Sequence, residues 1–113
     1  MQDIGFVSAI LSENSFDEVV KFASKQKFKC VEMMCWPKGK AERRYAGVTH
    51  INVENLDVQQ AKIINSTLSK NNIYISGLGY YPNPLDSDKK KSSMYIEHIK
   101  EVIIAAAKLG IPA

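Results

Sequence analysis

The stretch Cys30-Val31-Glu32-Met33-Met34-Cys35 decides the fold that this sequence predicts. It is a short apolar run with one acidic residue, which indicates a strand buried on both faces of a parallel sheet. A long basic and aromatic segment follows it, from Trp36 to Asn55. Loops of this length are uncommon inside compact domains and tend to be functional or disordered. A buried strand that ends in such a loop is typical of the active-site side of a barrel of alternating strands and helices.

Two further strands are predicted from apolar runs. Residues 4–10 are almost continuously apolar and predict a first strand that is buried on both faces. Residues 73–79 predict a third strand that contains Gly77 and Gly79. Glycines inside a strand allow another backbone or a ligand to come close.

Three helices are predicted between and after these strands. Ser15 with Glu18, and Asp57 with Gln60, have the spacing of capping boxes and start the first two helices. The third helix is expected to stop at Gly110. The apolar faces expected to pack on the sheet are Phe16, Val19, Val20 and Ala23; Ala61, Ile64 and Leu68; and Tyr95, Ile99, Val102, Ile103, Ala106 and Leu109.

The predicted elements alternate between strand and helix along the whole chain. Because crossovers between parallel strands are right-handed, the strands are expected side by side in sequence order with the helices on one face. The predicted fold class is therefore α/β, with a parallel sheet made by three consecutive βα units of a (β/α)8 TIM barrel. Residues 1–113 would form the N-terminal part of that barrel as one domain. Such a partial barrel leaves both sheet edges unpaired, so it requires the remaining units or further copies of itself.

The composition indicates a soluble globular protein. The 113 residues are 45% hydrophobic and 24% charged, and no apolar run approaches the roughly 20 residues of a membrane span. The apolar opening lacks the positively charged segment of a signal peptide. Cys30 and Cys35 lie on opposite faces of one predicted strand, about 16 Å apart, so they cannot form a disulfide with each other. Reduced, buried thiols agree with a cytoplasmic location.

The net charge of +3 is concentrated in the loop after the second strand. Lys38, Lys40, Arg43 and Arg44 stand there against one acid, Glu42. Of the 15 basic and 12 acidic residues, this leaves 11 of each in the rest of the chain. A local basic excess argues against non-specific binding of nucleic acid and for one local anionic partner.

Five stretches resemble a known family. They are Ile4-Gly5-Phe6; Phe28-Lys29-Cys30-Val31-Glu32; Met34-Cys35-Trp36-Pro37-Lys38-Gly39-Lys40-Ala41-Glu42-Arg43-Arg44-Tyr45; Gly79-Tyr80-Tyr81-Pro82-Asn83-Pro84; and the Ala-Ala-x-Leu-Gly-Ile-Pro ending at Pro112. Together they resemble the sugar phosphate isomerases/epimerases of the xylose-isomerase-like TIM-barrel superfamily, which also includes endonuclease IV. The resemblance covers the first three of eight units. Lys27 and Cys30 stand where the family often has glycines.

The resemblance implies a divalent metal in the full-length family member. Its Glu, Asp and His ligands lie on later strands, so no metal ligand and no catalytic residue is expected in this chain. Endonuclease IV has a metal-binding His just after its third strand, where this sequence has Tyr80 and Tyr81. That difference weakens the interpretation as a DNA-repair enzyme.

Ser8, Trp36 and Tyr80 occupy the expected C-terminal ends of the three strands, where TIM barrels carry their sites. Polar residues on the second strand, in the long loop and after the third strand complete the candidate substrate-binding set. The whole set is Ser8, Glu32, Trp36, Lys38, Arg43, Arg44, His50, Tyr80, Tyr81 and Asn83.

Several of these residues have a structural alternative. Trp36 either stacks on a sugar or forms a hydrophobic lid, and Glu32 either contacts substrate or pairs with a basic residue of a neighbouring unit. His50 either binds a ligand or packs within the loop. The loop bases either hold a phosphate, whose oxygens match arginine forks, or form a solvated charged segment.

Three hypotheses follow for function. The first is the N-terminal portion of a metal-dependent sugar or sugar phosphate isomerase/epimerase, catalytically incomplete by itself, whose partners are a small sugar or sugar phosphate and the rest of the barrel. The second is a non-catalytic α/β chain that self-associates as a homo-oligomer. The third and weakest is endonuclease IV-like action on abasic DNA.

Overall fold

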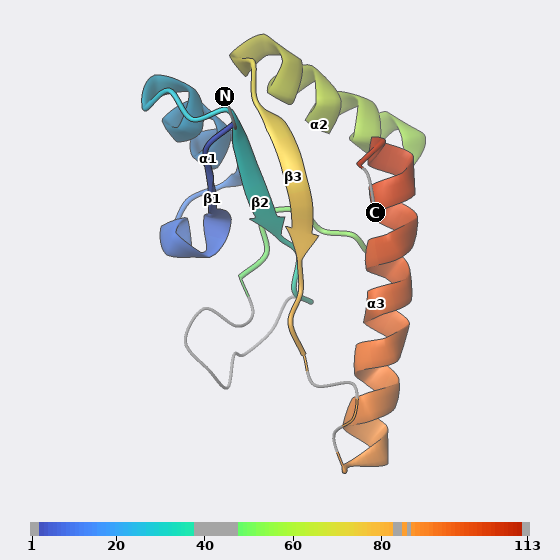
Figure 1. Ribbon diagram of the computed structural model, residues 1–113. Coiled ribbons are helices and arrows are strands. Elements are labelled where there is room, and N and C mark those ends of the chain that lie inside the picture. The colour runs from blue at the N-terminus through green and yellow to red at the C-terminus, as the bar shows by residue number, and fades with distance from the viewer. Residues whose placement is uncertain (1–2, 38–47, 83–84, 86, 112–113) are drawn as a thin grey trace.

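A parallel three-stranded sheet forms the centre of the computed structural model (Figure 1). The structure describes residues 3–37, 48–82, 85 and 87–111. Strands β1 (Gly5–Val7), β2 (Cys30–Met34) and β3 (Tyr74–Gly79) lie in sequence order, and both neighbouring pairs are parallel. The prediction of a mixed α/β fold with a parallel sheet is confirmed.

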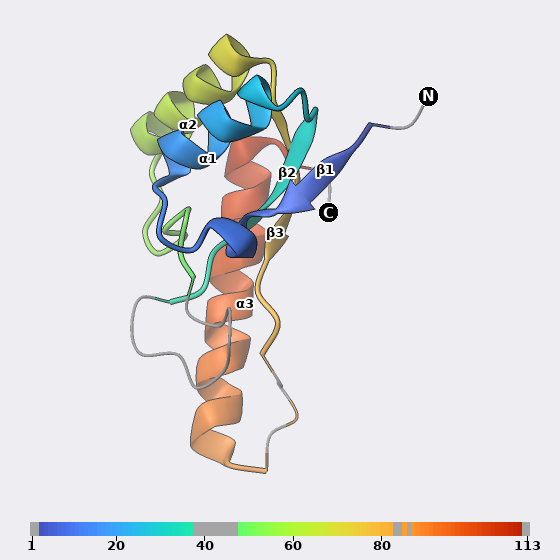
Figure 2. The same cartoon turned by 90° about the vertical axis from the view of Figure 1, so that its left-hand side faces the viewer.

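Three helices lie on one side of this sheet. They are α1 (Phe16–Lys25), α2 (Val58–Asn71) and α3 (Lys89–Leu109). Seen edge-on, the strands form one layer and the helices the other, so no helix of the described residues lies on the second face of the sheet (Figure 2). We call that second face the bare face of the sheet.

The helix boundaries follow from local hydrogen bonding. Both predicted capping boxes are present: Ser15 and Glu18 exchange side-chain and backbone bonds, and so do Asp57 and Gln60. These bonds satisfy amide groups that the first turn of a helix leaves unpaired. Helix α3 ends at Gly110, whose φ of 73° lies in the left-handed region that favours glycine.

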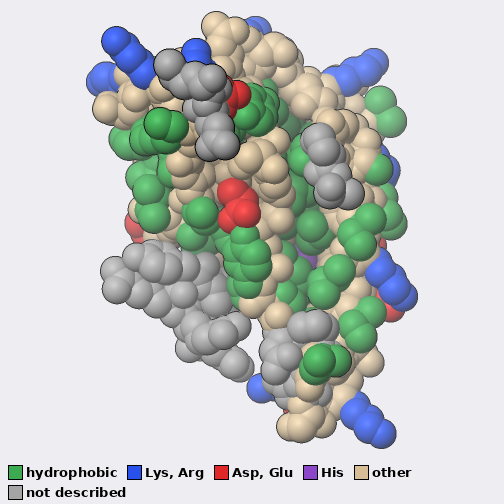
Figure 3. Space-filling view, viewed as in Figure 1, with side chains coloured by type: hydrophobic (Ala, Val, Ile, Leu, Met, Phe, Trp, Pro, Cys, Tyr) green, Lys and Arg blue, Asp and Glu red, His purple; other side chains and the backbone are tan. Residues whose placement is uncertain are grey.

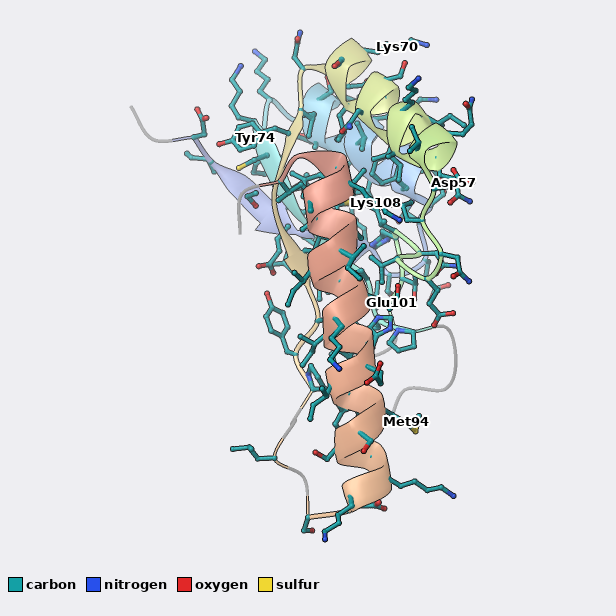
Figure 4. The ribbon with its side chains drawn as sticks, turned by 90° about the vertical axis from the view of Figure 1, so that its right-hand side faces the viewer. Asp57, Lys70, Tyr74, Met94, Glu101 and Lys108 are labelled. Carbon is teal, nitrogen blue, oxygen red and sulfur yellow. The ribbon has the colours of Figure 1, made fainter. Side chains whose placement is uncertain are left out.

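The core lies between the sheet and its helices. Val31, Met33 and Cys35 point from β2 and its end into this layer and are fully buried. The predicted faces of α1 and α2 are confirmed, since their side chains are either buried or packed against the same core. Lys108 of α3 donates to the carbonyl oxygen of Leu56 at 2.7 Å, which ties α3 to the start of α2 (Figure 4).

The first strand is shorter and more exposed than predicted. It ends at Val7, and residues 8–11 form a 3-10 helix in place of further strand. Ile4 and Val7 are exposed, so the prediction of burial on both faces is wrong. The reason is tertiary: β1 is an edge strand, and one side of it belongs to the bare face.

The predicted inner face of α3 is correct at Leu109, which is buried, and at Val102, which packs against the core. It is wrong at Ile103, which is 61% exposed, and it left out His98 and Ala105, which are buried. His98 was left out because only apolar side chains were counted. Including it gives the spacing 98, 102, 105 and 109, which is one face of a helix.

The second half of the long loop packs into the core. Thr49 forms an isolated antiparallel bridge with Cys35, and Ile51, Val53 and Leu56 are buried. The first half of the loop, residues 38–47, lies outside the described residues.

Two smaller predictions concern the cysteines and the membrane. Cys30 and Cys35 are both free and buried, as predicted. Within the described part of the chain, no helix combines the length and apolar character that crossing a membrane requires.

The core predicts a clear difference between buried and exposed truncations. Met33→Ala removes a fully buried side chain from the central strand and should lower the free energy of unfolding by about 2–5 kcal/mol. Ile63→Ala, at a helix position that is 57% exposed, is the matched control and should change it by less than about 0.5 kcal/mol. Urea unfolding followed by circular dichroism measures both. Equal losses in the two variants would contradict this assignment of the core.

Candidate functional site

The bare face of the sheet carries one carboxylate near its middle. Glu32 pairs with Val7 of β1 and with Gly77 of β3, so its side chain projects from the central strand between these neighbours. Figure 3 views this face and shows acidic atoms at its centre among hydrophobic ones. The carboxylate lies over β3, because a methyl group built on Gly77 or Gly79 would approach its oxygens to 3.9 and 3.4 Å.

Tyr81 completes this group from the chain that leaves β3. Its hydroxyl donates to Glu32 Oε2 at 2.5 Å. Partial burial, the hydrogen bond to Glu32 and the charge of Glu32 raise the pKa of Tyr81 to about 12. The phenol therefore keeps its proton at neutral pH and acts as a hydrogen-bond donor. The hydrogen-bond partner of Glu32 within the described chain is thus a phenol and not the basic residue that the structural alternative supposed.

Ser8 and His50 form a second, buried group at the ends of β1 and β2. The Ser8 hydroxyl accepts the Met34 amide N–H at 2.8 Å and lies 2.7 Å from His50 Nδ1. His50 Nε2 lies 3.0 Å from the Leu11 carbonyl oxygen, which only accepts. Nε2 therefore carries a proton, and when the ring is neutral the Ser8 hydroxyl donates to Nδ1.

This second group is engaged within the protein. Ser8 is fully buried and His50 is 8% exposed. The backbone N–H groups of His50 and Ile51 both donate to the Met34 carbonyl oxygen, at 2.9 and 3.3 Å, which bonds the loop to the end of β2. These contacts favour a structural role for both residues over the ligand contact that was predicted for them.

Trp36 and Tyr80 meet at the C-terminal end of the sheet, as the predicted strand ends imply. Their ring centroids are 4.8 Å apart in an edge-to-face arrangement. Tyr80 contacts the ring of His98 in the same way at 4.5 Å, and burial is the main cause that raises the pKa of Tyr80. Trp36 Nε1 is buried and has no hydrogen-bond partner among the described residues. We call Trp36, Tyr80 and His98 the aromatic column; their rings pack together at the end of the core, next to α3.

His98 is a residue of this column that the sequence interpretation missed. Its Nε2 donates to the Cys35 carbonyl oxygen at 2.8 Å, at the point where β2 ends. The available signal was its position on the helix, in step with Val102, Ala105 and Leu109. A polar residue in step with an apolar face is easily taken for a break in that face.

Four predicted site residues lie outside the described residues. They are Lys38, Arg43, Arg44 and Asn83. Their proposed contact with a phosphate or sugar therefore stays a prediction from the sequence.

A hollow beside α3 is an alternative place for a ligand. It has a volume of about 540 Å³ and includes Met94 and Glu101, which lie along α3 (Figure 4). Glu54 and Glu97 also line it. Three carboxylates around one hollow repel an anion, so this place is unsuited to a phosphate.

The described residues contain no set of ligands for the metal that the family resemblance implies. No group of three or more His, Cys, Asp or Glu side chains in these ranges is placed to hold an ion. We therefore derive no chemical step through a metal from the residues of this chain.

Neither models of known protein families nor curated proteins match this chain.

The Ser8–His50 group predicts that stability falls in mild acid. Burial lowers the pKa of His50 below its ordinary value of 6.5. Hydrogen bonds to the backbone of Leu11 and Asn14 raise this pKa, but their effect is smaller than that of burial. The unfolded chain therefore binds a proton more readily than the folded chain, so stability is lost as pH falls from about 6.5 towards the folded pKa. Each unit of difference between the two pKa values is about 1.4 kcal/mol.

The measurement compares urea unfolding at pH 7.5 and pH 5 for the wild type and for His50→Gln. The glutamine amide can still donate to the Leu11 carbonyl but does not titrate, so this variant should lose much less stability between the two pH values. An identical loss in both proteins would show that other groups cause it.

Proposed function

We propose that this chain supplies the first three βα units of a metal-dependent sugar or sugar phosphate isomerase/epimerase with a (β/α)8 TIM-barrel fold. The observation that carries the proposal is the Glu32–Tyr81 pair on the bare face of the sheet. A carboxylate in an apolar strand is costly unless it has a partner or a task, and a phenol on the same face gives it a donor.

The arrangement of the elements supports the barrel. Three parallel strands in sequence order with every crossover helix on one face match an arc of a barrel, whose interior is the face without helices. A doubly wound sheet has helices on both faces and a reversal of strand order. Neither feature occurs among the described residues.

The chemistry assigns this chain a binding task. Isomerisation takes a proton from the carbon next to a carbonyl and stabilises the resulting enediolate with a cation. The metal supplies that cation when it is bound by the later strands that the proposal requires. Within this chain, Glu32 offers hydrogen-bond acceptors to the hydroxyls of a sugar and Tyr81 holds its carboxylate in place. The chain alone is therefore expected to be inactive.

The phosphate part of the proposal rests on the sequence. Lys38, Lys40, Arg43 and Arg44 follow the C-terminal end of β2, the end of the sheet at which TIM barrels bind their substrates. Arginine forks match the oxygens of a phosphate.

The test is an assay of the full-length protein with Mn²⁺ or Mg²⁺ against ketose and aldose phosphates. We expect interconversion that requires the metal. Because a hydrogen bond to a charged group contributes about 1.5–3 kcal/mol, Glu32→Ala should lower kcat/KM roughly tenfold to hundredfold. Asp17→Asn, at an exposed position on α1, is the control and should leave kcat/KM unchanged. Absence of turnover with every metal and substrate pair would refute the proposed reaction.

A second candidate is a non-catalytic chain that closes its sheet with further copies of itself. The observation in its favour is the exposed apolar surface on and beside the bare face, where Ile4, Val7 and Tyr74 are 70%, 40% and 49% exposed. The described parts of β1 and β3 each pair on one side only. Exposed strand edges readily pair with another chain.

Sedimentation velocity separates the two candidates. Discrete oligomers of this chain that dissociate in Val7→Lys would support self-association, because a charge on the exposed face prevents its burial in an interface. Lys62→Glu, a charge change on α2, is the control and should leave the oligomers intact. A well-folded monomer would contradict the second candidate.

A further inference from the structure

The hollow beside α3 has an acidic wall on each side. One wall is a single face of α3, because Met94, Glu97, His98 and Glu101 are three or four positions apart in the helix (Figure 4). The opposite wall includes Glu54, from the loop that precedes α2. The volume of about 540 Å³ lies within the range of small-molecule sites.

His98 gives this hollow a polar atom that the protein does not use. The residue is 7% exposed and lines the hollow. Its Nε2 donates to the Cys35 carbonyl oxygen at 2.8 Å, so in the neutral ring Nδ1 carries a lone pair. No described residue donates a hydrogen bond to Nδ1. Because Tyr80 packs on the ring and little of it is exposed, a donor reaches Nδ1 from the hollow.

The chemistry of the lining selects a cation with several N–H groups. The carboxylates of Glu54, Glu97 and Glu101 only accept hydrogen bonds, and so does His98 Nδ1 in the neutral ring. Among the described residues, no three His, Cys, Asp or Glu side chains are placed to hold a metal ion. The acceptors are therefore too widely spaced for a bare ion and suit charges that are distributed along an organic molecule.

We propose that this hollow binds an aliphatic polyamine. A primary ammonium group has three donors and no acceptor, so one such group can bond to Glu101 and to His98 Nδ1 together. A second ammonium group binds at Glu54 on the opposite wall, and the methylene chain between them lies against Met94 and Pro37. The hollow lies on the helix side of the sheet, away from the Glu32–Tyr81 pair, so this inference does not depend on the proposed function.

The test is an NMR titration of the protein with spermidine. We expect spermidine to shift the amide signals of Glu54, His98 and Glu101. Glu101 is half-buried and less screened by salt than Glu54, so Glu101→Gln should raise the dissociation constant about five- to tenfold and Glu54→Gln about two- to fivefold. Glu13→Gln makes the same chemical change at an exposed position away from the hollow and should leave it unchanged.

His98→Gln tests the unused acceptor. The glutamine amide can still donate to the Cys35 carbonyl oxygen in place of Nε2, but none of its atoms replaces Nδ1. We expect the dissociation constant for spermidine to rise about threefold or more, because a hydrogen bond to a charged group is lost. Circular dichroism checks the fold of this variant, and the two exposed glutamate variants decide the question if it does not fold.

Two further probes separate hydrogen bonding from simple attraction of positive charge. Hexamethonium carries two quaternary nitrogens without N–H groups, and Mg²⁺ carries the same charge on one ion; both should bind much more weakly than spermidine. Equal affinity for either of them would overturn the inference. So would spermidine binding that leaves the amides of Glu54, His98 and Glu101 unshifted, or that Glu13→Gln weakens as much as Glu101→Gln does.

Discussion

The central strand β2 has to satisfy two different environments at once, and the rest of the structure depends on this constraint. Successive side chains of a strand point to opposite faces. Val31 and Met33 therefore enter the fully buried core beneath the helices, while Glu32 between them projects from the bare face. A register shift of one residue would place the carboxylate in the core, where it would be strongly destabilising.

A buried polar network holds the end of this strand. The Ser8 hydroxyl accepts a hydrogen bond from the Met34 amide and bonds to Nδ1 of His50. The His50 backbone amide in turn donates to the Met34 carbonyl oxygen. The network joins β1, β2 and the long loop through groups that would be costly to leave unpaired in a buried place. Below it, Trp36, Tyr80 and His98 pack edge to face and join the sheet to α3. Among the described residues of the candidate set, Glu32 and Tyr81 are the polar ones that lie outside these two groups.

Individual residues show how far sequence reasoning reached into the candidate site. The meeting of Trp36 with Tyr80 was predictable, because both follow the ends of adjacent parallel strands. The joining of Ser8 to His50 was not, because 42 residues separate them and the loop between carries no periodic signal. Glu32 was recognised as unusual from its apolar surroundings, but its partner Tyr81 is 49 residues away in the sequence, and no local pattern links the two.

The sequence by itself determined the elements and their order. Capping boxes, apolar periods and the left-handed stops at Asn72 and Gly110 are local signals, since each depends on residues a few positions apart. Only the tertiary structure decided which face of the sheet stays bare, that β1 is cut short at Ser8, and that α3 turns His98 inward. These outcomes depend on contacts between residues far apart in the chain, whose energies no local pattern records.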